Sequence, residues 1–174
     1  MTKKILMIIA PKNFRDEEYF TPKNMFLEKH FKITTASLNT DIATGKLGGT
    51  TNIDLDIHEI NSKEYDALVL IGGSGAMIYS KNLILNKIIN EFYEQNKLVS
   101  AICIAPVLLA ESGILKNKKA TVWNTDKNQE IILRNHGSTY VNQNVVIDNN
   151  LITANGPESA EEFGKEIVKY LKEV

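Results

Sequence analysis

Three short, mainly apolar runs constrain the fold of this chain more than any other feature. They lie at residues 5–10, 66–71 and 98–102. None of them alternates apolar with polar residues, as a strand with one exposed face would, so we expect both faces of each strand to be covered. This pattern is typical of a parallel sheet packed between helices. The first run is therefore predicted to be a central strand or nearly so.

The segments between these runs complete an alternation of strands and helices. After a loop at residues 11–16, helices are predicted at residues 17–30, 83–95, 105–112, 125–135 and 157–170. Further strands are predicted at residues 31–37, 119–123, 140–141, 145–148 and 151–154. The Gly- and Thr-rich residues 39–52 indicate turns or a small hairpin, and residues 54–63 give no clear prediction. The expected fold is α/β: one domain over residues 1–174, a three-layer αβα sandwich with a doubly wound, mostly parallel, flavodoxin-like sheet.

Charge and cysteine content exclude several classes of function. The net charge of −1 gives no attraction to nucleic acid or to an anionic membrane, so neither is an expected partner. The first apolar run is too short for the core of a signal peptide, and a single cysteine cannot form an internal disulfide. A cytoplasmic location is therefore expected. The three histidines are scattered without ligand spacing, so no metal or cofactor is expected.

Cys103, the only cysteine, lies where a predicted strand runs directly into a predicted helix. Ala101 and Ala105 flank it at the two small positions of a nucleophile elbow, and Pro106 suits the first turn of the helix. A lone cysteine is most often a small buried apolar residue. The elbow pattern favours a nucleophile instead, with the helix N-terminus expected to stabilise a thiolate.

A glycine loop, residues 72–75, ends the second apolar run. Ile78 replaces the third glycine of a dinucleotide-binding loop, so the segment does not fit that function. The loop is either an ordinary tight turn or a source of backbone N–H groups for an oxyanion. In the second case the donors would be the N–H groups of Gly73 and Ile104.

Carboxylates open the first predicted helix at Glu17 and Glu18. In a doubly wound fold this loop, the glycine loop and Cys103 all follow strands at the same edge of the sheet. A glutamate facing the sulfur there would have a raised pKa and could transfer protons. His30, His58 and His136 could serve as a base, but capping or surface positions account for each of them.

Together these segments resemble the ThiJ/PfpI family, within the class I glutamine-amidotransferase-like fold. The matching segments are residues 5–10, 14–18 (Phe-Arg-Asp-Glu-Glu) with Pro22, 70–73 (Leu-Ile-Gly-Gly), 101–106 (Ala-Ile-Cys-Ile-Ala-Pro) and 155–157 (Asn-Gly-Pro). The resemblance implies that Cys103 is the reactive cysteine and that Glu18 contacts its sulfur. It also implies an oxyanion site at Gly73 and Ile104, and a homo-oligomer that is a dimer or larger.

Three positions depart from members of that family. Protease-like members have histidine at the position of Ile104 and glutamate at that of Met77, and deglycase-like members have histidine where this chain has Trp123-Asn124. Gly72, Glu17, Trp123 and Asn124 are expected near the pocket.

The resemblance implies three functions. The leading expectation is a cysteine-dependent enzyme acting on small reactive carbonyls, glyoxalase-like or deglycase-like. The alternatives are a hydrolase of peptides or amides, and a redox sensor or chaperone that uses an oxidisable Cys103.

Overall fold

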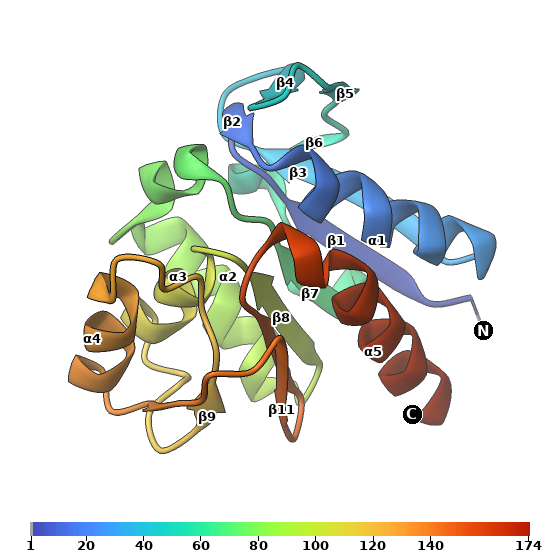
Figure 1. Ribbon diagram of the computed structural model, residues 1–174. Coiled ribbons are helices and arrows are strands. Elements are labelled where there is room, and N and C mark those ends of the chain that lie inside the picture. Colours follow the sequence, from blue (N-terminus) through green and yellow to red (C-terminus); the bar gives the residue numbers. More distant parts are fainter. Residues whose placement is uncertain (1) are drawn as a thin grey trace.

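A seven-stranded sheet forms the centre of the computed structural model, which describes residues 2–174 (Figure 1). The strand order is β11-β12-β8-β7-β1-β3-β6. These strands are β1 (Lys4–Ile8), β3 (Lys32–Ser37), β6 (Leu55–Asp56), β7 (Ala67–Leu70), β8 (Leu98–Ile102), β11 (Val145–Asp148) and β12 (Leu151–Ala154). Every neighbouring pair is parallel except β11 and β12. The predicted doubly wound, mostly parallel sheet is confirmed.

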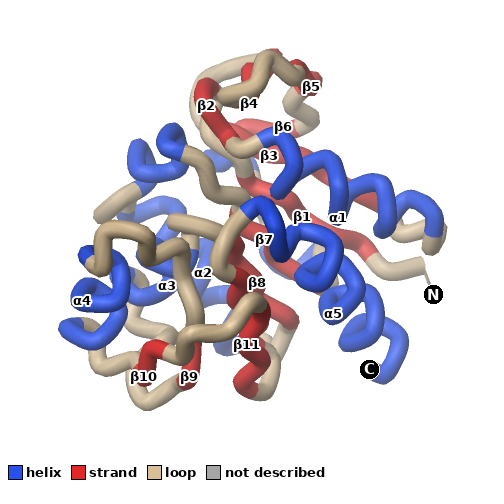
Figure 2. Tube along the Cα trace, viewed as in Figure 1, coloured by secondary structure: helices blue, strands red, loops and turns tan. Residues whose placement is uncertain are grey.

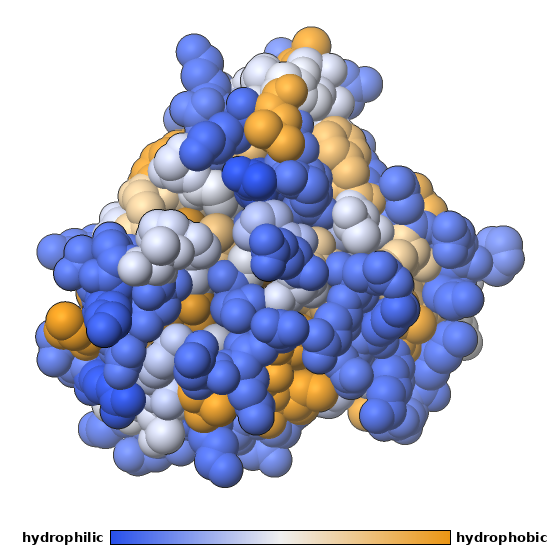
Figure 3. Space-filling view, in the orientation of Figure 1, coloured by the Kyte–Doolittle hydropathy of each residue, from blue (hydrophilic) through white to orange (hydrophobic). Residues whose placement is uncertain are grey.

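Helices cover both faces of this sheet, which gives the predicted three layers (Figure 2). The helices are α1 (Asp16–Glu28), α2 (Leu83–Glu94), α3 (Pro106–Glu111), α4 (Asn128–Asn135) and α5 (Ala160–Glu173). Ile5 and Met7 pack in the core beneath α1 and α5, whereas Leu6 and Ile8 pack in the core beneath α2 and α3. Both faces of β1 are therefore buried, which explains why its sequence does not alternate. The face seen in Figure 3 is predominantly hydrophilic.

The order of the strands brings three loops together. The chain moves from β1 outward through β3 and β6, and then returns to the other side of β1 for β7, β8 and β12. Ligand sites in such folds form at this reversal, beyond the carboxyl ends of the strands. Because β8, β7 and β1 are direct neighbours, the segments that follow them meet at one edge.

A second, three-stranded sheet lies beside that edge, at the top of Figure 1, and is formed by β2 (Lys12–Phe14), β4 (Ile42–Gly45) and β5 (Thr50–Asn52). The hairpin expected within residues 39–52 is present as the antiparallel pair β4–β5. The loop predicted at residues 11–16 is wrong in part, because it contains β2. Only Phe14 of the three β2 residues is buried, so the strand leaves no apolar pattern in the sequence.

Three predicted segments near the C-terminus have different boundaries. Of residues 119–123 only β9 (Lys119–Ala120) is a strand, and it pairs with β10 (Thr139–Tyr140) outside the main sheet. Helix α4 begins at Asn128 instead of residue 125, since Lys127 takes a left-handed conformation with φ of 61°. The last helix is split into a 3₁₀ turn, Pro157–Ser159, and α5.

Residues 54–63, which gave no clear prediction, hold β6 and two 3₁₀ turns, Ile57–Glu59 and Ser62–Glu64.

None of the helices within residues 2–174 combines the length and the apolar character that crossing a bilayer requires.

Asn82 caps the N-terminus of α2. Its Oδ1 accepts hydrogen bonds from the backbone N–H groups of Ile84 at 3.0 Å and Leu85 at 2.9 Å. We expect Asn82→Ala to lower the free energy of unfolding by about 1 kcal/mol, because two helix-end donors lose their partner. Chemical denaturation measures this loss. Asn86→Ala, inside the same helix, is the control, and an equal loss in both variants would contradict the capping role.

Candidate active site

Cys103 occupies the strand-to-helix elbow predicted for it. It follows β8 directly, and Pro106 is the first residue of α3. The φ angle of Cys103 is 66°, a left-handed conformation that costs a non-glycine residue about 1–3 kcal/mol. Two hydrogen bonds hold it there: its N–H donates to the Ala154 carbonyl at 2.9 Å, and its carbonyl accepts from the Trp123 N–H at 2.8 Å. The fold thus maintains a strained backbone at the sulfur.

Backbone N–H groups and one carboxyl group surround the Cys103 side chain. The backbone N–H groups of Gly73 and Ile104 lie near the sulfur and favour its charged form, lowering the pKa of Cys103 against the effect of burial. Glu18, on the first turn of α1, is fully buried beside it, and its Oε2 accepts a hydrogen bond from the Gly72 N–H at 3.1 Å. The other oxygen, Oε1, has no partner of ordinary hydrogen-bond geometry among residues 2–174. A buried carboxyl oxygen is therefore left available to the sulfur or to a bound molecule.

Two glycines allow these groups to approach so closely. A Cβ on Gly72 would lie 2.6 Å from the Cys103 Cβ and 2.7 Å from Glu18 Oε2. Gly73 has a φ of 93°, and a Cβ there would lie 2.5 Å from the backbone nitrogen of Arg15. Larger residues would separate the sulfur from the carboxyl. The glycine loop is thus more than an ordinary tight turn, because close packing around the sulfur depends on it.

Burial dominates the electrostatics of Glu18 and Cys103. Burial raises the pKa of Glu18 to about 7, although the thiol, Arg15 and the Gly72 N–H favour its charged form. Burial, together with the neighbouring Glu18 charge, raises the pKa of Cys103 to about 12. The N-terminus of α3 was expected to favour a thiolate, and this effect is smaller than the opposing effects of burial and of an ionised Glu18. The N–H groups of Gly73 and Ile104 do favour the thiolate, but burial outweighs them.

The two groups are close enough that they titrate as a pair. The negative charge of Glu18 opposes ionisation of the thiol, so removing one proton from the pair makes removal of the second harder. Between the two titrations the pair holds one proton. If that proton is on the carboxyl, the sulfur is a thiolate facing two N–H groups and a carboxylic acid. The arrangement can therefore supply a nucleophile and an acid together.

A cavity of about 410 Å³ opens onto the sulfur. Its lining residues are Arg15, Glu18, Lys46, Gly73, Ser74, Met77, Cys103, Ile104, Trp123 and Pro157. The set contains the predicted residues Cys103, Glu18, Gly73, Ile104 and Trp123. Gly72 lies behind the lining, where it binds Glu18. Lys46 was missed, because it belongs to a turn-rich segment in which no residue pattern points to a site.

Glu17 and Asn124, both expected near the pocket, do not line it. Glu17 binds the Arg15 guanidinium through two hydrogen bonds, of 2.8 and 3.0 Å. Asn124 instead holds the start of α4: its Oδ1 accepts from the Glu130 N–H at 3.0 Å, and its side-chain nitrogen donates to the Glu130 carboxylate at 3.1 Å. Glu17 therefore holds Arg15, which lines the cavity, and Asn124 holds Glu130 in the first turn of α4.

The three histidines also lie away from the sulfur. His30 follows the end of α1, and His58 pairs with Asp56 on a 3₁₀ turn. His136 follows α4, where its Nδ1 bonds the Ile132 carbonyl at 2.9 Å. None of them lines the cavity at Cys103.

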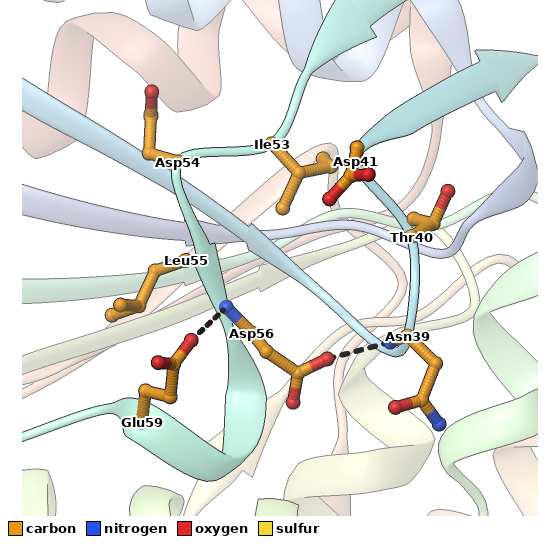
Figure 4. A pocket seen from close by; sticks show the side chains of 8 residues that line it. All are labelled: Asn39, Thr40, Asp41, Ile53, Asp54, Leu55, Asp56 and Glu59. Carbon is orange, nitrogen blue, oxygen red and sulfur yellow. Dashed lines mark hydrogen bonds between the residues drawn. The ribbon is translucent and has the colours of Figure 1, made fainter.

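Another cavity, of about 300 Å³, is rich in carboxylates (Figure 4). Asp54 accepts a hydrogen bond from the Thr35 N–H, Asp56 accepts one from the Asn39 N–H, and Glu59 accepts one from the Asp56 N–H. Within residues 2–174, no cluster of three or more His, Cys, Asp or Glu side chains is arranged to hold a metal ion. These carboxylates stabilise the loop, and the reactive groups are gathered at Cys103.

Comparison with known proteins places this geometry in a family. An uncharacterised protein of Methanocaldococcus jannaschii is 42% identical over 97% of this chain and 82% of its own length. A deglycase of Thermococcus kodakarensis is 31% identical over 96% of this chain and 99% of its own. The crystal structure of a ThiJ/PfpI domain protein from Brachyspira murdochii superposes with a TM-score of 0.95 at 34% identity, covering 99% of this chain and 98% of that one. The DJ-1/PfpI family model matches residues 3–170, and the chain belongs to that family.

Proposed function

We propose that the protein is a cysteine-dependent enzyme acting on small reactive carbonyl compounds, glyoxalase-like or deglycase-like, with Cys103 as nucleophile and Glu18 as acid and base. The observation that carries the proposal is the pairing of the Cys103 sulfur with a buried carboxyl whose pKa is about 7. A group with that pKa can accept and donate protons near neutrality. The relative named a deglycase supports the same class of substrate.

Methylglyoxal illustrates the chemistry that the site could perform. The sulfur adds to the aldehyde carbon, and the proton shared by the pair passes to the carbonyl oxygen, which gives a hemithioacetal. Glu18 then removes the proton from that carbon, and a proton is returned to the adjacent carbon. The first carbon is oxidised to a thioester and the second is reduced to an alcohol, so no external oxidant is needed. Water hydrolyses the thioester to lactate and frees the thiol.

The surroundings of the sulfur suit each step. The N–H groups of Gly73 and Ile104 that face the sulfur would also stabilise the oxygen that becomes negative when the carbonyl is attacked. Met77, Ile104, Trp123 and Pro157 give the cavity apolar walls that strengthen these interactions. A volume of about 410 Å³ accommodates a small dicarbonyl compound.

A redox role for the same sulfur is the second candidate. The donors that would hold an oxyanion, the N–H groups of Gly73 and Ile104, would also bind the oxygens of a cysteine sulfinate. A peptide hydrolase is less favoured, because each of the three histidines lies away from the cavity lining.

The deciding experiment follows methylglyoxal and its product in D₂O. We expect wild-type protein to convert methylglyoxal to lactate, with deuterium at C2 because Glu18 exchanges its proton with solvent. Proton NMR measures both the amount of lactate and its deuterium content. Absence of lactate above the protein-free rate would contradict the proposal. In that case a mass gain of two oxygens at Cys103 after mild peroxide would favour the sensor, and cleavage of a fluorogenic peptide panel would favour the hydrolase.

A further inference from the structure

We propose that the cavity at Cys103 selects carbonyl compounds that carry an anionic group, and that Lys46 is the residue that recognises this group. The inference deepens the proposed function, on which its statement about substrates rests. It concerns a residue in the turn that follows β4 of the small sheet, outside the elbow, the glycine loop and α1. Lys46 lines the same cavity as the sulfur and is exposed to solvent.

Backbone hydrogen bonds fix the position of Lys46 at the cavity. Its N–H donates to the Phe14 carbonyl at 2.8 Å. The next residues are tied to buried Asp16, whose two carboxylate oxygens accept from the N–H groups of Leu47 at 2.8 Å and Gly49 at 2.7 Å. The turn after β4 is therefore anchored to the first residue of α1, two residues before Glu18. The side chain of Lys46 therefore extends from a fixed backbone position beside the cavity.

The charge of Lys46 is available to a ligand. Within residues 2–174 its ammonium makes no ion pair and no hydrogen bond to the protein. Arg15, the other cation of the lining, is already held by both oxygens of Glu17. Its charge nevertheless acts on Glu18 and Cys103. The lining thus presents two cations against one carboxyl, and Lys46 is the one without a protein carboxylate.

The remaining lining limits where an anion could bind. Met77, Ile104, Trp123 and Pro157 offer mainly apolar surface, which a desolvated anion avoids. A carboxylate or phosphate placed toward Lys46 would leave the carbonyl end of the molecule for the sulfur. The matching substrate class is a 2-oxoaldehyde with an acidic group a few bonds from its carbonyls.

Alkylation of Cys103 tests the charge preference without any turnover. Iodoacetate and iodoacetamide are similar in size and differ by one charge. The rate of alkylation of Cys103 by iodoacetate divided by the rate by iodoacetamide therefore reports the electrostatic potential at the sulfur. We expect Lys46→Met to lower this ratio about threefold and Lys46→Arg to retain it. Lys169→Met removes the same charge on α5 at an exposed position and should leave the ratio unchanged. Equal ratios in wild type and Lys46→Met, or an equal fall in Lys169→Met, would overturn the inference.

Turnover identifies the anionic group. 4,5-Dioxopentanoate and its uncharged analogue 5-methyl-2-oxohexanal form the carboxylate pair, and hydroxypyruvaldehyde phosphate provides the phosphate arm. We expect Lys46→Met to lower kcat/KM about threefold for an acidic substrate and to leave it unchanged for the uncharged one. The acidic substrate whose kcat/KM falls more in Lys46→Met shows whether the site prefers a carboxylate or a phosphate. If wild type consumes all of them without a charge-dependent effect of Lys46→Met, the inference fails and the proposed function stands. If none is consumed, the proposed function fails, and the alkylation ratio alone decides the role of Lys46.

Discussion

Cys103→Ser is expected to lower the turnover of methylglyoxal about a thousandfold or more, because the hydroxyl that replaces the thiol is a far weaker nucleophile. Removal of an activated nucleophile typically has an effect of this size or larger. Serine is close to cysteine in size, so it leaves the cavity and the contacts of the elbow nearly unchanged. The N–H groups of Gly73 and Ile104 remain in place. Loss of methylglyoxal and appearance of lactate, measured at equal protein concentration, give the ratio of rates.

Two controls separate chemistry from folding in that experiment. The thermal unfolding midpoint of Cys103→Ser should stay within a few degrees of wild type, since serine fits the same partly exposed position. Met77→Leu changes an apolar wall of the cavity without altering the sulfur, and it should retain most of the activity. Wild-type turnover in Cys103→Ser would show that another group performs the reaction, and the proposed nucleophile would be wrong.

The fold was predictable because its strongest determinants are local. The runs at residues 5–10, 66–71 and 98–102 place apolar residues on both faces, and each contains a strand of the main sheet, as β1, β7 and β8. Their adjacency follows from the doubly wound order, which places the segments after them at one edge. The amino-acid sequence therefore suffices to predict that Gly73 and Glu18 lie near Cys103. The contacts of Gly72 with Cys103 and Glu18, and the cavity that Glu18, Gly73 and Cys103 line together, agree with that prediction.

The parts that could not be predicted depend on long-range backbone contacts. Strand β2 is held by pairing with β4, about thirty residues later, and its own side chains carry no pattern. Asp16 looks like an ordinary acidic residue of a first helical turn, but it is buried because it binds two N–H groups of the β4–β5 turn. The same turn places Lys46 at the cavity. Composition therefore could not distinguish Lys46 from the other lysines of the surface.

The electrostatics of the site were predictable only in part: the raised pKa of a glutamate facing the sulfur was expected, whereas the raised pKa of the thiol was not. A helix N-terminus behind a cysteine suggests an easily ionised thiol, and that effect is local. Burial beside Glu18 is a product of the whole fold, and it raises the pKa of both groups. The two glutamates that begin α1 consequently differ. Glu17 pairs with Arg15, which lowers its pKa against the opposing effect of burial, whereas Glu18 faces the sulfur.

Glu18→Gln is expected to lower turnover about a hundredfold to ten-thousandfold and to change how stability depends on pH. The amide fills the same space and cannot carry the proton between substrate atoms, which accounts for the loss of rate. The change in stability follows from burial. The pKa of Glu18 is raised from 4.5 to about 7 in the folded protein, so the folded state binds more protons than the unfolded state between these values. Wild-type stability contributed by this group therefore falls as pH rises through that window.

Glu18→Gln has no carboxyl at this position, so its stability lacks the fall with rising pH that Glu18 causes in the wild type. The difference in stability between the two proteins therefore has a definite sign and size. Relative to wild type, Glu18→Gln should gain about 3 kcal/mol in free energy of unfolding between pH 4 and pH 8, as the shift of the Glu18 pKa requires. The raised pKa of Cys103 affects stability only above pH 9, outside this window. Chemical denaturation at several pH values gives the difference. Glu162→Gln, at an exposed position of α5, is the control and should keep wild-type turnover. A difference between Glu18→Gln and wild type that stays constant from pH 4 to pH 8 would show that folding does not raise the pKa of Glu18. The carboxyl would then be fully ionised near neutrality and could not serve as the acid of the proposed reaction.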